Sequence, residues 1–144
     1  VILGSVAVQN PALVKEACQK YEERIIVGID AKDGIVAVDG WGVSGEVEAG
    51  ELAKRMVNAG VRTIIYTDIS RDGTLSGVNA EATVALAKES GAAVIASGGV
   101  NSLDDIRRLK ALEADGVCGV IVGKSIYTGA LDLQEAIEIA GQEG

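Results

Sequence analysis

Two segments of the chain carry side chains that could transfer protons. Asp30 closes a run of apolar and glycine residues, where an acid is costly to bury without a purpose. Thr67 ends a second apolar run, and Asp72 follows it in a loop that also holds Arg71. Carboxylates in unlike environments can divide acid and base roles. The competing interpretation is that Asp30 caps a turn and that Arg71 pairs locally with an aspartate.

Two glycine turns predict a binding site for phosphate. Gly98 and Gly99 follow Ser97 after one apolar run, and Gly123 precedes Lys124 after the next. Glycine lets the backbone approach an anion closely, and N–H groups at the start of a helix favour negative charge. In (β/α)8 barrels, the loops after the last two strands commonly bind phosphate.

Five short apolar runs must position these residues, and their aligned ends are expected to bring Asp30, Asp72 and the two glycine turns around one pocket. The runs begin near residues 1, 25, 63, 93 and 119, and each is followed by enough chain for a helix. Continuous apolar runs alternating with helices are typical of buried parallel strands. We therefore expect an α/β fold, a partial (β/α)8 TIM barrel of five parallel βα units within a single domain spanning residues 1–144. The alternative is an open doubly wound sheet, in which the strand order would reverse.

Local signals set the expected boundaries. Asn10-Pro11, Asn79 and the Ser102/Asp105 pair are typical helix starts. A short hairpin is expected at residues 35–41, with a turn at 39–40 and with Trp41 as a ring that could stack on a planar ligand. The expected strands span residues 1–8, 24–30, 61–68, 92–97 and 117–122. The expected helices cover about residues 11–21, 46–59, 80–90, 103–114 and 132–140, with a short helix near residue 125.

Composition excludes several classes of partner. The formal net charge is −8 and no basic cluster occurs, so nucleic acid is not an expected partner. No apolar run reaches transmembrane length and no signal peptide is visible, so we expect a cytoplasmic protein without a membrane partner. Cys18 and Cys118 are expected to be buried, reduced thiols, and no metal site is expected. With no histidine, proton transfer near neutral pH needs carboxylates, Cys, Lys, Tyr or hydroxyls.

The chain resembles the isomerases of histidine biosynthesis that act on phosphoribosylformimino-5-aminoimidazole carboxamide ribotide. The resemblance covers nearly the whole chain and matches the fourth through eighth units of that family's barrel. It implies an aldose–ketose (Amadori) isomerisation of a bis-phosphorylated substrate, with no cofactor and no metal. The motifs that carry it lie at residues 27–30, 40–41, 67–77, 95–100 and 120–127.

The resemblance also implies residue roles. Asp30 and Asp72 match catalytic carboxylates, and Thr67 matches a threonine that supports the reacting sugar. Trp41 matches a mobile ring that stacks on the substrate. The residues implied in phosphate binding are Gly98, Gly99, Gly123 and Lys124. From the residues themselves we add Ser97, which precedes the first glycine turn, and Arg71 from the same loop as Asp72.

The family's other catalytic aspartate lies on the first barrel strand, which this chain lacks. The chain begins in a strand without Met, so we expect it to be part of a longer polypeptide and inactive alone. Its open sheet edges would need the missing N-terminal strands or a second copy. The alternatives are the related cyclase subunit of imidazole glycerol phosphate synthase, an isomerase that also serves tryptophan synthesis, and a non-catalytic half-barrel.

Overall fold

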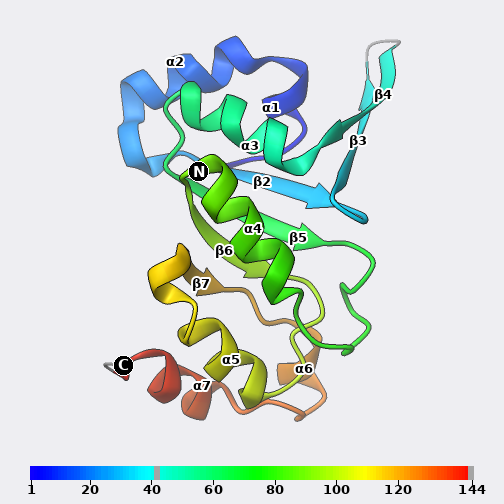
Figure 1. The fold of residues 1–144 in the computed structure, drawn as a ribbon, viewed down its shortest axis with the longest axis vertical. Coiled ribbons are helices and arrows are strands. Elements are labelled where there is room, and N and C mark those ends of the chain that lie inside the picture. Colours follow the sequence, from blue (N-terminus) through cyan, green and yellow to red (C-terminus); the bar gives the residue numbers. More distant parts are fainter. Residues whose placement is uncertain (41–42, 143–144) are drawn as a thin grey trace.

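The computed structural model describes residues 1–40 and 43–142, and within them helices follow parallel strands in regular alternation (Figure 1). The strands are β1 (Ile2–Leu3), β2 (Ile26–Ala31), β3 (Ile35–Gly40), β4 (Val43–Glu48), β5 (Thr63–Asp68), β6 (Ala93–Ser97) and β7 (Val117–Val120). The helices are α1 (Val6–Gln9), α2 (Pro11–Tyr21), α3 (Ala49–Asn58), α4 (Ala80–Ser90), α5 (Leu103–Lys110), α6 (Lys124–Tyr127) and α7 (Leu133–Ala140). Single 3₁₀ turns occupy Glu22–Arg24 and Glu113–Asp115.

The main sheet runs in chain order. Its five strands, counted over the described residues, follow the order β1-β2-β5-β6-β7, and every neighbouring pair is parallel. A doubly wound sheet would reverse direction at a switch point, and this sheet does not. The order therefore confirms the expected partial (β/α)8 barrel.

The two faces of this sheet differ in burial. Val27, Ile29 and Ile64 point to one face and are almost fully buried. Their neighbours along the strands point to the opposite face, because successive side chains in a strand alternate. Ile2 and Ile121 are 61% and 45% exposed. The buried face is the outer face of the curved sheet, and the other is called the inner face below.

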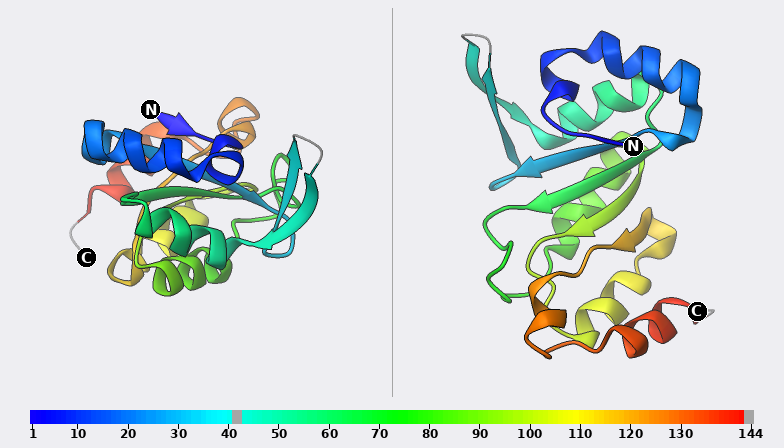
Figure 2. Two further views of the ribbon diagram at one scale, coloured as in Figure 1. Left: turned by 90° about the horizontal axis from the view of Figure 1, so that it is seen from above. Right: turned by 180° about the vertical axis from the view of Figure 1, so that it is seen from behind.

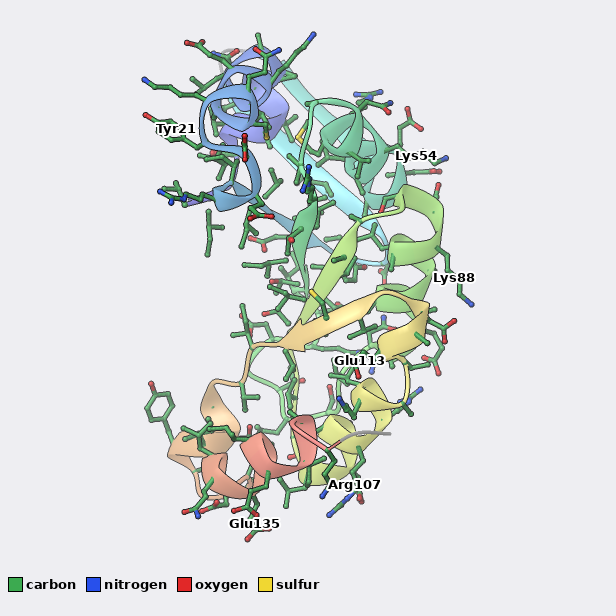
Figure 3. All side chains as sticks on the ribbon, turned by 90° about the vertical axis from the view of Figure 1, so that its left-hand side faces the viewer. Tyr21, Lys54, Lys88, Arg107, Glu113 and Glu135 are labelled. Carbon is green, nitrogen blue, oxygen red and sulfur yellow. The ribbon has the colours of Figure 1, made fainter. Side chains whose placement is uncertain are left out.

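The helices cover the outer face. Figure 3 shows the strands inside an open curve with α3, α4 and α5 around its outer side. Side chains from α2, α3 and α4 join Val27, Ile29 and Ile64 in one apolar core, and α5 and α7 build a second core with β7. The antiparallel hairpin β3–β4 stands away from the sheet beyond the end of β2 (Figures 1 and 2). The inner face carries no helix among the described residues.

The predicted helix starts are confirmed. Pro11 opens α2 while the Asn10 side chain accepts a hydrogen bond from the Leu13 N–H at 3.2 Å. The Asn79 side chain accepts one from the Ala82 N–H, also at 3.2 Å. The carboxylate of Asp105 reaches back to the Ser102 N–H at 3.4 Å. These side chains satisfy N–H groups that have no partner within the helix.

Four local predictions were wrong, one of them the burial of Cys118, which is exposed. The strand expected over residues 1–8 ends at Leu3, and residues 6–9 form α1. Asp39 and Gly40 do not make the hairpin turn, because both still pair with β4. Residues 46–48, expected to begin a helix, lie in β4, where Val47 pairs with Val36, since α3 begins only at Ala49. Trp41 lies outside the described residues.

Candidate functional site

Three polar residues form a row across the inner face. Asp30 of β2 is in register with Thr67 of β5, and Thr67 is in register with Ser97 of β6. Neighbouring strands lie about 4.8 Å apart, so their side chains form one continuous polar strip. Asp30 is exposed and the other two are half-buried. The strip lies at the carboxyl ends of the strands, the edge at which parallel α/β proteins bind ligands.

A cavity of about 110 Å³ adjoins this row on the β6 side. Pockets that enclose a drug-sized ligand span about 300–1,000 Å³, so this cavity fits one end of a ligand. It brings together six of the residues singled out from the sequence, from loops after three different strands. These are Asp72, Ser97, Gly98, Gly99, Gly123 and Lys124.

A second cavity of about 210 Å³ adjoins the row on the other side. Asp30 borders it together with Gly4 and Ser5, which follow β1. The lining of this cavity also includes Ile29, Val36 and Leu52 from the apolar core of the outer face. Asp30 therefore faces one cavity and Asp72 the other, with Thr67 at the centre of the strip. A ligand with two anionic ends could span this arrangement.

The glycines beside the first cavity serve different purposes. Gly98 and Gly99 have φ of +97° and +79°, where side chains are rarely accommodated. A Cβ atom on Gly98 would lie 2.6 Å from the Asp68 carbonyl oxygen, and one on Gly99 would lie 2.7 Å from that of Gly77. A Cβ atom on Gly123 would meet nothing within 4 Å. The fold itself therefore requires Gly98 and Gly99, whereas Gly123 leaves space beside the cavity.

Arg71 is turned toward its own loop. Its Nη1 donates to the Gly77 carbonyl at 3.3 Å, and its Nε lies 3.7 Å from Oδ2 of Asp68. Arg71 is not among the residues that line the cavity beside Asp72. Lys124 does line that cavity, and its Nζ donates to the Gly73 carbonyl at 3.1 Å. The loop after β5 is thus held by Arg71, which belongs to the loop itself, and by Lys124, which follows β7.

Asp68 is a residue whose importance the sequence did not reveal. It ends β5 on the outer face and is only 5% exposed. Burial opposes its ionisation, but hydrogen bonds from Ser70 and Asn79, together with the charge of Arg71, outweigh this and lower the pKa of the carboxyl. Asp68 is therefore ionised and internal, which suits a structural anchor. The alternation of side chains along β5 was the signal that could have placed Asp68 on the opposite face of the sheet from Thr67.

Two further features bear on ligands and partners, namely metal-binding clusters and membrane-spanning helices. Among the described residues, no cluster of three His, Cys, Asp or Glu side chains could hold a metal ion. None of the helices in the described part of the chain has the length and apolar character needed to cross a bilayer.

The chain-ordered parallel sheet, with its helices outside and its polar row at the carboxyl edge, defines an α/β protein of the (β/α)8-barrel class. Its family follows from sequence comparison. The model of the family described as "Histidine biosynthesis protein" matches residues 1–132, and the chain belongs to that family.

Curated relatives are similar over nearly all of this chain. One from Hahella chejuensis is 58% identical over 94% of the chain, one from Trichlorobacter lovleyi is 58% identical over 96%, and one from Thermoanaerobacter pseudethanolicus is 56% identical over 97%. Each is named a 1-(5-phosphoribosyl)-5-((5-phosphoribosylamino)methylideneamino) imidazole-4-carboxamide isomerase. The matched region is 56–58% of the length of these relatives, so the chain spans little more than half of each.

Proposed function

We propose that residues 1–144 form one domain that supplies the last five βα units of a phosphate-binding (β/α)8-barrel isomerase. Family membership, the chain-ordered sheet and the partial coverage of the relatives support this proposal. The first three units would come from an N-terminal segment or, failing that, a second copy would cover the exposed inner face and the sheet edges. The chain would then work in the cytoplasm on a small-molecule substrate, without nucleic acid, membrane or cofactor.

The proposed reaction is the isomerisation for which the relatives are named. A proton delivered to the ring oxygen breaks the C1–O bond of the aminoaldose while the nitrogen lone pair forms a C1=N bond. Loss of the C2 proton to a base gives the enaminol. Return of a proton to C1 and loss of the proton on the C2 hydroxyl then leave the aminoketose. The step is an internal redox exchange between C1 and C2, so it needs general acid–base catalysis and no external oxidant.

We assign the acid–base chemistry of this half of the site to Asp30 and Asp72, with Thr67 supporting the sugar between them. The observation that carries the assignment is the register of Asp30, Thr67 and Ser97 across three strands, flanked by two cavities. Fixing both ends of a long substrate positions its middle for proton transfer. The remaining carboxylate would come from the first barrel strand.

We assign one phosphate to the cavity beside Asp72. Gly123 leaves space for the anion there, and Lys124 supplies a positive charge. Gly98 and Gly99 shape the wall, and Ser97 contributes a hydroxyl. The second phosphate would occupy the cavity beside Gly4 and Ser5, and the Trp41 ring would stack on the imidazole. Binding by Arg71 would require it to leave Asp68 and Gly77.

Activity after completing the barrel tests this proposal. The chain is assayed for ribotide isomerisation alone and after mixing with the first three βα units of the Hahella chejuensis relative. We expect activity only in the mixture. No activity in the mixture, despite a stable complex, would contradict the proposal and favour a half-barrel that only assembles.

The residues Thr67-Asp68-Ile69-Ser70 fit the isomerase better than the related cyclase, which usually places Ser after Thr.

A further inference from the structure

The loop that carries Asp72 is built on the buried carboxylate of Asp68. Oδ1 of Asp68 accepts hydrogen bonds from the Ser70 N–H at 3.0 Å and from the Ser70 hydroxyl at 2.5 Å. Oδ2 accepts one from the side-chain amide of Asn79 at 2.9 Å. One carboxylate therefore ties the start of the loop to its end, because Ser70 follows β5 and Asn79 caps α4.

The backbone of Asp68 holds the same loop from the other side. Its carbonyl oxygen accepts from the N–H groups of Arg71 and Asp72, each at 3.1 Å. The Gly77 N–H in turn donates to the Gly99 carbonyl at 2.9 Å, which joins this loop to the next glycine turn. Asp72 thus belongs to a loop that Asp68 holds at its start through Ser70, at Asp72 itself through the backbone, and at its end through Asn79.

We propose that Asp68 is a positioning residue whose carboxylate, through Ser70 and Asn79, holds the loop so that Asp72 borders the cavity. The inference rests on the proposed function for its consequence in catalysis. Asp68 is only 5% exposed and lines neither of the two cavities. Its chemical requirement is an acceptor on both oxygens, because each one meets a donor.

Asp68→Asn turns one of these two oxygens into a donor and also removes the negative charge that faces Arg71. The amide oxygen of asparagine still accepts from Ser70, but its NH₂ group now meets the NH₂ group of Asn79, and two donors face each other. Adding Asn79→Asp reverses the polarity and restores the pair, while aspartate remains a good N-cap for Ala82. Asp104→Asn is the matched control, because Asp104 is an exposed acceptor paired with Arg107 on α5.

Amide hydrogen exchange of the full chain measures how well the loop is held. We expect Asp68→Asn to accelerate exchange of the Asp72 and Gly77 amides by about tenfold or more, while amides in β2 keep their rates. In the double variant the rates should return to within about threefold of wild type. Asn79→Ser, which keeps a capping hydroxyl but removes the amide donor, should reproduce the acceleration if Asp68→Asn does not fold.

Equal acceleration throughout the chain would overturn the inference, since Asp68 would then support only global stability. Unchanged loop amides, or no recovery in the double variant, would also overturn it. In the completed barrel, Asp68→Asn should lower kcat by about tenfold or more and leave KM within about threefold. If the wild-type mixture has no activity, the proposed function fails while the exchange measurement still decides the role of Asp68.

Discussion

Two aspartates at the ends of neighbouring strands have opposite surroundings. Asp30 is exposed on the inner face, beside a cavity. Asp68, which pairs with Ala31 in the ladder, lies one position further along the register and is buried on the outer face. A shift of one residue in a strand moves a side chain to the other face of the sheet. The same chemical group therefore becomes a candidate catalyst in one place and a structural anchor in the other.

Asp30→Asn should have the largest effect on activity. In the completed barrel we expect a loss of about 10²–10⁴-fold in kcat, because a proton-transfer group is replaced by an amide of the same shape. Asp33→Asn is the matched control, since Asp33 lies in a nearby turn with φ of +53°, which asparagine tolerates. Steady-state kinetics check both variants, and equal losses would refute a special role for Asp30.

Gly98→Ala and Gly123→Ala should separate folding from ligand binding. Gly98→Ala should reduce the free energy of unfolding by about 2–4 kcal/mol, because its Cβ atom would clash with the Asp68 carbonyl at a positive φ. Gly123→Ala should change it by about 0.5 kcal/mol or less, yet weaken binding of inorganic phosphate several-fold, because the methyl group enters the space beside the cavity. Urea unfolding and phosphate titration measure these effects. Loss of stability in Gly123→Ala would remove the distinction.

Asp68→Ala should destabilise the chain by about 2–3 kcal/mol, because it leaves the donors of Ser70 and Asn79 without their acceptor. Asp30→Ala should change stability by only about 0.5 kcal/mol, as expected for an exposed residue. Chemical denaturation of the two variants side by side provides the measurement. Similar losses in both would mean that the two faces do not differ as described.

Acidification should remove the contribution of Asp68 to the free energy of unfolding, and this is the smallest effect that we predict. The lowered pKa of Asp68 means that its ionised form stabilises the folded chain above its ordinary pKa of about 3.9. This stabilisation is lost as the pH falls through the lower pKa of the folded state. The stability difference between wild type and Asp68→Asn should therefore shrink on acidification below about pH 4. A difference that is constant or grows would contradict the assignment.

Much of the fold was predictable because its signals are local. The apolar runs located all five parallel strands, and the caps at Asn10 and Asn79 located two helices to within a residue. Residues 6–8 were mistaken for strand because Val-Ala-Val favours extended structure. They form a short helical turn in which Ala7 enters the core, so packing outweighs propensity there.

We expected Asp30, Asp72 and the two glycine turns to surround one pocket. Asp72 and the glycine turns line one cavity, whereas Asp30 borders the other. Spacing alone did not separate the two cavities. It could not assign Arg71, because whether a guanidinium faces a ligand or its own loop depends on side-chain packing. Nor did it find that Gly98 and Gly99 are required by contacts with the preceding loop, since those contacts join residues more than twenty positions apart.

Titration of the completed barrel with the ribotide, followed through backbone amide resonances, tests the central claim most directly. One ligand that spans the inner face should shift the amides of Asp30, Thr67, Ser97 and Gly123 together, with a single saturation point. Shifts confined to one cavity, or resonances that saturate at different ligand concentrations, would contradict a shared site across the carboxyl edge of the sheet.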